Sequence, residues 1–315
     1  MSDPLRVEFG RGGRVESVHR VHAAVVQGKK RLLARGDVRT PVFMRSSAKP
    51  IQAIAVVETG TADAFDLTAE ELAVVCGSHG ADEVHLAAVA SILMKAGLTS
   101  TALDCGTHPP SSPKALKALH AKGEEPTAMH NNCAGKHAGM TATAKHMREP
   151  VETYLAPTHP VQKRNLENVA RFTGVPARSI KLGIDGCSAP TFAVPLEAMA
   201  RASARLATED GAAKRVREAM MAHPVMVGRP CEKVMAAAPG KIVAKAGAEG
   251  VYMVGFPESG VGLAVKVEDG AGRALLYALS ALVRKLRLLK SPVALADPVL
   301  KNHAGRHVGD VTVGL

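Results

Sequence analysis

Aromatic side chains are scarce in this sequence. Its 315 residues include no tryptophan, and aromatic residues make up only 3% of the chain. The hydrophobic core must therefore be built from Ala, Val, Leu, Ile and Met, within a composition that is 46% hydrophobic. The same scarcity argues against a surface that stacks the bases of single-stranded nucleic acid.

Acidic residues are outnumbered by basic ones, which gives a net charge of +11 at pH 7. The basic residues are spread out, apart from residues 284–290, which we interpret as the solvated face of a C-terminal helix. No helix-turn-helix, zinc-finger or RNA-binding signature accompanies the charge. We expect no nucleic-acid partner, and we attribute the charge to solubility and to attraction of an anionic small substrate.

Closely spaced cysteine pairs and long apolar runs are both missing. The cysteine count is five, an odd number, which does not indicate a disulfide framework and favours a reducing compartment. The N-terminus lacks the apolar segment of a signal peptide, and no apolar run approaches the length of a membrane span. We therefore expect a cytoplasmic protein without a membrane partner.

Hydrophobic periodicity indicates strands near both ends of the chain and helices between them. Short apolar runs in residues 14–44 and a hairpin over residues 251–256 and 262–267 predict antiparallel strands. Helical spacing predicts helices over residues 49–59, 82–96, 113–121, 160–173, 196–206, 210–223 and 273–289. With no repeat and no linker, we predict a single domain over residues 1–315 of α/β (α+β) class. Its antiparallel sheet would come from distant parts of the chain, with a helical cluster beside it.

The first candidate chemical group is a serine followed three residues later by a lysine, Ser46 and Lys49. On a helical turn this spacing places both side chains on one face. A serine hydroxyl attacks a carbonyl only when a base removes its proton, and lysine serves as that base when burial or a nearby cation lowers its pKa. Arg45, beside them, suits either that electrostatic role or bidentate binding of a substrate carboxylate.

A second candidate serine lies in the run Gly77-Ser78-His79-Gly80, where glycines permit close approach of the backbone to a ligand. An ordinary turn between two helices explains the run equally well. Lys266 lies in an otherwise apolar run and shares a strand face with Ala264, which allows it to face either a site or water.

A third group combines two cysteines with a lysine: Cys133, Lys136 and Cys187. Two thiolates, one neutral amine and a water would complete the tetrahedron that zinc prefers, although lysine is an unusual zinc ligand. The alternative is a pair of small buried cysteines in glycine-rich turns. Asp185, just before Cys187 at the end of a predicted strand, is well placed to bind an ammonium group.

Five motifs occur in an order that closely resembles the Rhizobium-type L-asparaginases, the asparaginase II family. They are Arg45-Ser-Ser-Ala-Lys-Pro50, Cys76-Gly-Ser-His-Gly80, His130-Asn-Asn-Cys-Ala-Gly-Lys-His137, Gly183-Ile-Asp-Gly-Cys-Ser-Ala-Pro190 and residues 262–270. The resemblance covers essentially the whole chain. It implies a fold like that of serine β-lactamases, penicillin-binding proteins and glutaminases, and hydrolysis of L-asparagine to L-aspartate and ammonia.

The resemblance also implies roles for individual residues. Two serine–lysine pairs would match Ser46 with Lys49 and Ser78 with Lys266. A zinc ion would be bound by Cys133, Lys136 and Cys187, in a structural or substrate-orienting role, and the substrate would contact Arg45, His137 and Asp185. A homodimer is implied as well.

The expected mechanism is formation of an acyl-enzyme. Lys49 would take the proton of Ser46, which attacks the side-chain amide, while Ser78 with Lys266 relays protons. Backbone N–H groups near Ser46 or Ser78 would stabilise the oxyanion. Which serine attacks is left open by the sequence. The alternatives are a glutaminase or other amidohydrolase on the same scaffold, and a zinc-binding regulatory protein without catalytic activity.

Overall fold

The structure is a computed structural model that describes residues 2–290 and 295–315. The strands are β1 (Leu5–Arg11), β2 (Arg14–Gln27), β3 (Lys30–Arg35), β4 (Pro41–Phe43), β5 (Lys181–Ile184), β6 (Pro190–Pro195), β7 (Val243–Gly247), β8 (Val251–Phe256), β9 (Val261–Val267), β10 (Val299–Lys301) and β11 (His307–Gly314). The α-helices are α1 (Lys49–Glu58), α2 (Thr61–Ala64), α3 (Ala69–Val75), α4 (Glu83–Lys95), α5 (Pro113–Ala121), α6 (Ala134–His146), α7 (Pro160–Thr173), α8 (Leu196–Thr208), α9 (Ala212–Ala222), α10 (Pro224–Val227), α11 (Cys231–Ala236) and α12 (Leu275–Lys285).

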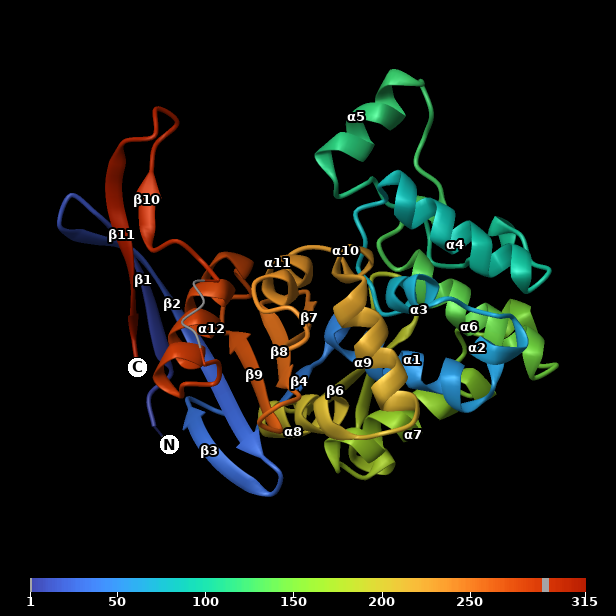
Figure 1. Ribbon diagram of the computed structural model, residues 1–315, viewed down its shortest axis with the longest axis horizontal. Helices are drawn as coiled ribbons and strands as arrows, with labels where there is room; N and C mark the ends of the chain where they lie inside the picture. Colours follow the sequence, from blue (N-terminus) through green and yellow to red (C-terminus); the bar gives the residue numbers. More distant parts are fainter. Residues whose placement is uncertain (1, 291–294) are drawn as a thin grey trace.

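The main sheet is antiparallel and joins both ends of the chain. Its strand order is β10-β11-β1-β2-β9-β8-β7, with β3 paired to β2. Strand β11 pairs with β1, so that Arg6 lies opposite Gly314. Figure 1 accordingly shows the two termini next to each other on the side of the molecule that carries the sheet, while the helical cluster occupies the other side. The predicted fold class, an antiparallel sheet from distant segments beside a helical cluster, is confirmed.

Helix α8 connects the sheet to the helical cluster. It packs against β2, β8 and β9 on one side and against α7 and α9 on the other. The close approach requires glycine in the sheet: a β carbon at Gly262 would lie 2.0 Å from the Ala200 carbonyl oxygen. Helix α12 covers part of the sheet as well, in contact with β1, β9 and β11 (Figure 1).

A small second sheet, in the order β4-β6-β5, lies at the base of the helical cluster. Strand β5 matches the predicted strand before Asp185, whereas β6 was not among the predicted strands. Its residues are almost all buried, and it pairs with both neighbours, so that Phe43 lies opposite Ala193. Met44 then continues this pairing through a backbone hydrogen bond to Phe192. The small sheet therefore fixes the backbone just before Arg45.

Helix α6 runs through the middle of the helical cluster. Every residue from 134 to 144 is buried, including Lys136 and His137. A β carbon at Gly135 would lie 2.2 Å from the Val74 carbonyl oxygen, so only glycine allows α3 to pack this closely. The helix has no polar face, and its ionisable side chains therefore need partners inside the protein.

No helix in the described part of the chain is long and apolar enough to cross a membrane. The core is composed mainly of aliphatic residues and methionine, as the sequence predicts, yet one of the largest fully buried side chains is that of Lys49. A lysine at 1% exposure is costly unless its ammonium group is hydrogen-bonded. The helical cluster therefore contains a polar centre.

Candidate active site

The Ser46–Lys49 segment is helical, as the spacing predicts. Residues Arg45–Ala48 form a short 3-10 helix that leads directly into α1, whose first turn accommodates Pro50. Arg45 adopts a left-handed conformation with φ of 50°, which is unusual for a residue other than glycine and often marks a functional constraint. Ser46 is half-buried, while Lys49 is directed into the interior.

Lys49 contacts Ser78 rather than Ser46. Its Nζ donates to Ser78 Oγ at 2.9 Å, to the Gly77 carbonyl at 2.6 Å and to the Asn132 carbonyl at 3.3 Å. These three acceptors match the three hydrogens of an ammonium group. Among the described residues no hydrogen bond joins Lys49 to Ser46, so the pair expected from the sequence is replaced by a contact with the second serine.

A second lysine reaches the same serine, and it is Lys245 on β7. Its Nζ lies 3.0 Å from Ser78 Oγ and 2.8 Å from the Ala246 carbonyl oxygen. Ser78 Oγ therefore accepts from two lysines, which occupy both of its lone pairs. With both amines charged its own hydrogen points away from them, whereas a neutral Lys245 accepts that hydrogen.

The predicted pairing of Ser78 with Lys266 is wrong. Lys266 is half-buried on β9, where its Nζ donates to the Val267 carbonyl oxygen. Lys266 shares a sheet face with Lys245, but strand β8 lies between their strands, β9 and β7. The residue of β9 that lies level with Lys245 is Ala264 rather than Lys266. Given strand spacing and pleat repeat, the two backbone positions are about 12 Å apart. Lys266 instead faces the acidic side chains of Glu249, Glu268 and Asp269.

Sequence reasoning missed Lys245 because its strand has little strand character. After Val243, the run Ala-Lys-Ala-Gly consists of residues that are depleted in strands. A signal was present, however: Lys245-Ala246-Gly247 resembles the Lys-Thr-Gly motif that accompanies Ser-x-x-Lys in class A β-lactamases and penicillin-binding proteins. Gly247 is required for packing, since a β carbon there would lie 2.7 Å from the Met44 carbonyl oxygen and 3.2 Å from the Ser47 nitrogen.

The environment of Lys245 favours a neutral amine. Burial lowers its pKa to about 8, and the positive charge of Lys49 acts in the same direction, against the opposing influence of nearby cysteines. By contrast, burial raises the pKa of Cys76, next to the two lysines, to about 12, so that thiol stays protonated. The site therefore contains an amine that changes charge near physiological pH.

Arg45 and Asp185 form an ion pair beside these lysines, with Arg45 Nε 2.7 Å from Asp185 Oδ1. Burial tends to raise the pKa of Asp185, but the hydrogen bond from Arg45 and the charge of Lys136 outweigh it and hold the pKa below its ordinary value. The pair presents one positive and one negative group to a ligand. An amino acid, with its own carboxylate and ammonium, complements both.

Cys133, Lys136 and Cys187 come together as the sequence predicts. Lys136 Nζ lies 3.0 Å from Cys187 Sγ. The hydrogen bond from Cys187 holds the pKa of Cys133 well below its ordinary value. Burial acts to lower the pKa of Lys136, but the two sulfurs outweigh it, so the pKa is raised.

This donor set fits a zinc ion only if lysine serves as a ligand. The described residues contain no group of three or more His, Cys, Asp or Glu side chains that could hold a metal. Two sulfurs and one amine nevertheless converge on one point. Two soft thiolates and a nitrogen match the preferences of zinc, provided that Lys136 loses its proton on binding.

His137 is fully buried next to this group. Its Nδ1 lies 2.6 Å from Tyr154 Oη, which itself accepts from the Asp104 backbone N–H at 2.9 Å. The tyrosine hydrogen is therefore donated to Nδ1. Burial and nearby lysines keep the pKa of His137 well below its ordinary value, so the ring is neutral and carries its proton on Nε2. Nε2 is buried and has no hydrogen-bond partner within the described residues.

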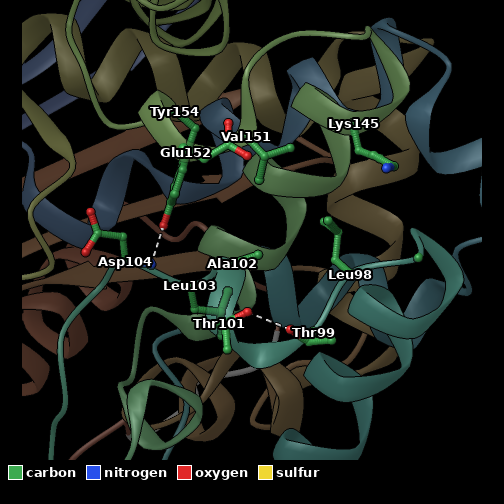
Figure 2. Close-up of a pocket in the computed structure, with 11 residues that line it drawn as sticks. Leu98, Thr99, Thr101, Ala102, Leu103, Asp104, Lys145, Val151, Glu152 and Tyr154 are labelled. Atoms are coloured by element: carbon green, nitrogen blue, oxygen red, sulfur yellow. Dashed lines mark hydrogen bonds between the residues drawn. The ribbon is translucent and has the colours of Figure 1, made fainter.

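Tyr154 also lines a cavity of about 570 Å³ on the far side of this contact. Figure 2 shows Tyr154 directed at Asp104, with Leu98, Thr99, Thr101, Lys145, Val151 and Glu152 around the cavity. None of the predicted site residues lines it. A second cavity, of about 550 Å³, has Ser78 in its wall. The reactive cluster therefore opens onto the second cavity rather than the first.

Comparison with solved structures gives one match that supports the fold and others of lower similarity. Mglu in its native form is 16% identical to this chain, with a TM-score of 0.50. The match covers 88% of this chain and 62% of the Mglu chain, so this chain spans less than two thirds of the length of Mglu. A putative beta-lactamase from Bacteroides dorei DSM 17855 is 14% identical (TM-score 0.43, 84% of this chain and 93% of that chain). A Bacillus glutaminase is also 14% identical (TM-score 0.43, 85% of this chain and 91% of that chain). Comparison with curated proteins gives no match.

The structure thus combines a mixed fold, an antiparallel sheet beside a helical cluster, with a serine that contacts two buried lysines and an ion pair. The sequence model described as L-asparaginase II matches residues 7–313. The chain belongs to the L-asparaginase II family, as the resemblance of its motifs predicted.

Proposed function

We propose that this protein hydrolyses L-asparagine to L-aspartate and ammonia through an acyl-enzyme on serine. The observation that carries the proposal is the position of Ser78 Oγ, 2.9 Å from Lys49 Nζ and 3.0 Å from Lys245 Nζ. A serine hydroxyl in contact with two lysine amines has the groups for the proton transfer that amide hydrolysis needs, and the chain belongs to the L-asparaginase II family.

Arg45 and Asp185 are the proposed anchors for the α-carboxylate and the α-ammonium group of the substrate. The ion pair between them, 2.7 Å long, would separate to accept one charged group each. Both side chains are largely buried, at 26% and 11% exposure, which strengthens their electrostatic interactions relative to a surface pair. The unpartnered Nε2–H of His137 adds a neutral donor to the substrate site.

Ser46 is the proposed nucleophile and Ser78 the proton relay. Hydrogen bonds from lysine N–H groups make Ser78 a poor nucleophile. When Lys245 is neutral, its amine accepts the Ser78 hydrogen, and one lone pair of Ser78 is free to take the proton of Ser46. Ser46 lies directly after Arg45 and is half-buried, so it is accessible from the substrate site. Its proton would pass through Ser78 to the lysine pair, and the same route would return a proton to the departing nitrogen.

Replacement of Ser46 tests this assignment. We expect Ser46→Ala to lower kcat for ammonia release from L-asparagine by more than about 10³-fold, because no acyl-enzyme can form. Ser47→Ala, which removes a hydroxyl that only donates to the Met44 carbonyl, is the matched control and should retain most activity. Activity of Ser46→Ala within tenfold of the wild type would exclude Ser46 as the nucleophile.

Zinc is proposed as a structural or substrate-orienting ion held by Cys133, Lys136 and Cys187. When bound, it would supply a fixed positive charge beside Asp185 and the substrate pocket. A serine nucleophile needs no metal-bound water, so we expect a chelator to raise KM more than it lowers kcat. Measurement of the metal content of the purified protein before and after chelation tests the assignment.

The same site also fits a glutaminase, the second candidate, because L-glutamine offers the same zwitterion with a longer side chain. We propose L-asparagine as the preferred substrate, in line with the family description. An ammonia-release assay on both amides tests the preference, and higher kcat/KM on L-glutamine would overturn it. A homodimer and a cytoplasmic location remain proposals, and light scattering of the purified protein measures the oligomeric state.

A further inference from the structure

The cavity beside Ser78 is much larger than the proposed leaving group. Its volume is about 550 Å³, whereas a molecule the size of water or ammonia occupies about 30 Å³. Cavities that bind small organic ligands measure about 300–1,000 Å³. Neither Arg45 nor Asp185, the proposed anchors of the aspartyl part, lines this cavity.

Three segments build the cavity, and the backbone of residues 78–80 holds two of them in place. On one side, the Ser78 N–H donates to the Val227 carbonyl at 2.9 Å, and a β carbon at Gly228 would lie 2.3 Å from the Ser78 carbonyl oxygen. On the other side, the Ser112 N–H donates to the Gly80 carbonyl at 3.1 Å. The walls therefore keep a fixed position relative to the Ser78 hydroxyl.

The charges around the cavity are of both signs. Asp82 accepts a hydrogen bond from Ser112 Oγ at 2.6 Å and is thereby engaged within the wall. Two cations, Lys114 at the start of α5 and Arg229 before α11, also line the cavity. Arg229 is 88% exposed and forms only a long contact of 3.5 Å with Glu232. Such a loose ion pair is weak and leaves the guanidinium able to bind another carboxylate.

Ser78 connects this cavity to the reaction. Its hydroxyl accepts from the lysine pair on one side, and the cavity that Ser78 lines borders it on the other. A leaving nitrogen that receives its proton from Ser78 must lie beside this hydroxyl. Any substituent on that nitrogen would extend into the cavity.

We propose that this enzyme also hydrolyses secondary amides of the aspartate β-carboxyl group, and that the cavity beside Ser78 binds the departing amine. The chemistry of its walls favours an amine that carries a carboxylate, which Lys114 and Arg229 would bind. The substrate class is therefore β-aspartyl dipeptides, in which an amino acid replaces ammonia. This inference rests on the proposed function, since the aspartyl half uses the same anchors.

The reaction balances with water as the only co-reactant. The serine oxygen forms a bond to the β-carbonyl carbon, its proton passes through Ser78 to the lysine pair, and the C–N bond breaks as the nitrogen takes a proton from Ser78. The amino acid leaves as a free amine. Water then hydrolyses the ester, which yields L-aspartate and restores the serine hydroxyl.

Three substrates test the proposal with the wild-type enzyme: L-asparagine, N4-ethyl-L-asparagine and β-L-aspartylglycine. Release of L-aspartate is measured for each. We expect kcat/KM for β-L-aspartylglycine within about tenfold of that for L-asparagine, and at least tenfold above that for the ethyl amide, which has the bulk but lacks the carboxylate. Hydrolysis of L-asparagine without hydrolysis of β-L-aspartylglycine would overturn this inference alone. No hydrolysis of any of the three would overturn the proposed function.

A charge variant tests the role of the cavity cations. Arg229→Gln should lower kcat/KM for β-L-aspartylglycine at least tenfold and leave the values for the other two substrates within twofold. Arg215→Gln is the control, since Arg215 pairs with Asp63 and does not line the cavity. Equal loss on all three substrates, or no loss on the dipeptide, would contradict carboxylate binding by Arg229.

Discussion

Three buried lysines distinguish this site at the scale of single residues. Lys49, Lys136 and Lys245 are 1%, 3% and 2% exposed, respectively. An isolated buried ammonium is costly, so each needs either good partners or a lowered pKa. Lys49 has three oxygen acceptors and Lys136 has two sulfurs, whereas Lys245 has its pKa lowered to about 8. Lys245 is therefore the best candidate for the general base.

The pH dependence of the reaction follows from Lys245. The groups that face it are Lys49 on α1, Cys76 after α3, Cys133 before α6 and Cys231 on α11. The pKa of Lys245 is about 8, so the amine is mostly neutral at higher pH. At lower pH the neutral fraction falls tenfold per pH unit. We expect kcat/KM for L-asparagine to rise about tenfold from pH 6 to pH 7 and to level off above pH 8.

A pH–rate profile of the wild type with constant ionic strength makes this measurement. Lys266→Met serves as the control, since Lys266 lies outside the serine cluster and its loss should leave the profile unchanged. A profile that is flat between pH 6 and pH 9, or that falls over this range, would exclude a neutral Lys245 as the base.

Some residues of the site could be predicted from the sequence and others could not. Arg45 was predicted to lie at the site because it stands beside Ser46 and Lys49, and Asp185 because it ends a predicted strand; the structure pairs the two. The lysine partners of Ser78 were not predicted, because strand register decides which lysine reaches the site. A shift of two residues along a strand moves a side chain by about 7 Å. Lys245 and Lys266 lie on different strands and at different register positions. Neither property can be predicted from the residues next to each lysine in the sequence.

At the scale of elements, the helices were predicted better than the strands. The bounds of α5 and α7 agree with the prediction because proline at the first turn marks each beginning, and a left-handed glycine after α7 marks its end. The closing helix, expected over residues 273–289, spans only Leu275–Lys285 as α12. Strands β6 and β7 were missed, because short buried strands of small residues lack the alternation that predicts a strand.

The contact between β7 and the 3-10 helix at Arg45–Ala48 positions the site, and Gly247 makes it possible. A β carbon there would lie 2.7 Å from the Met44 carbonyl oxygen, so Gly247→Ala must displace one of the two segments. We expect kcat for L-asparagine to fall at least tenfold and the free energy of unfolding to fall by about 1–3 kcal/mol.

Gly272→Ala is the matched control for this element, since a β carbon at Gly272 meets no atom within 4 Å. Steady-state kinetics and urea unfolding of both variants make the comparison. If the two variants are indistinguishable in kcat and in stability, the contact between β7 and the 3-10 helix does not position the site.

At the scale of the whole molecule, the sheet joins the two ends of the chain and positions β7 against the helical cluster. The sequence predicted strands from distant segments, but β1, β10 and β11 were not among them. Their placement depends on long-range pairing, such as Phe9 opposite Val311, which local patterns do not specify. The prediction of a single domain over residues 1–315 remains a prediction.

The pairing of β11 with β1 should contribute to the stability of the whole sheet. Val311 is 6% exposed, whereas the adjacent Thr312 is exposed on the opposite face. We expect Val311→Lys to lower the free energy of unfolding by about 2–4 kcal/mol, because it buries a charge, and Thr312→Lys to change it by less than about 0.5 kcal/mol. Urea unfolding measures both, and equal effects would show that β11 does not pack as described.

The central claim is that Lys49 and Lys245 together activate the serines for amide hydrolysis. Ammonia release from L-asparagine by the wild type, Lys245→Met and Lys266→Met tests it most directly. We expect a loss of about 10²–10⁴-fold in kcat for Lys245→Met and nearly full activity for Lys266→Met. The melting temperature of Lys245→Met should be no lower than that of the wild type, because a buried amine has been removed. Full activity of Lys245→Met together with loss of activity in Lys266→Met would contradict the central claim.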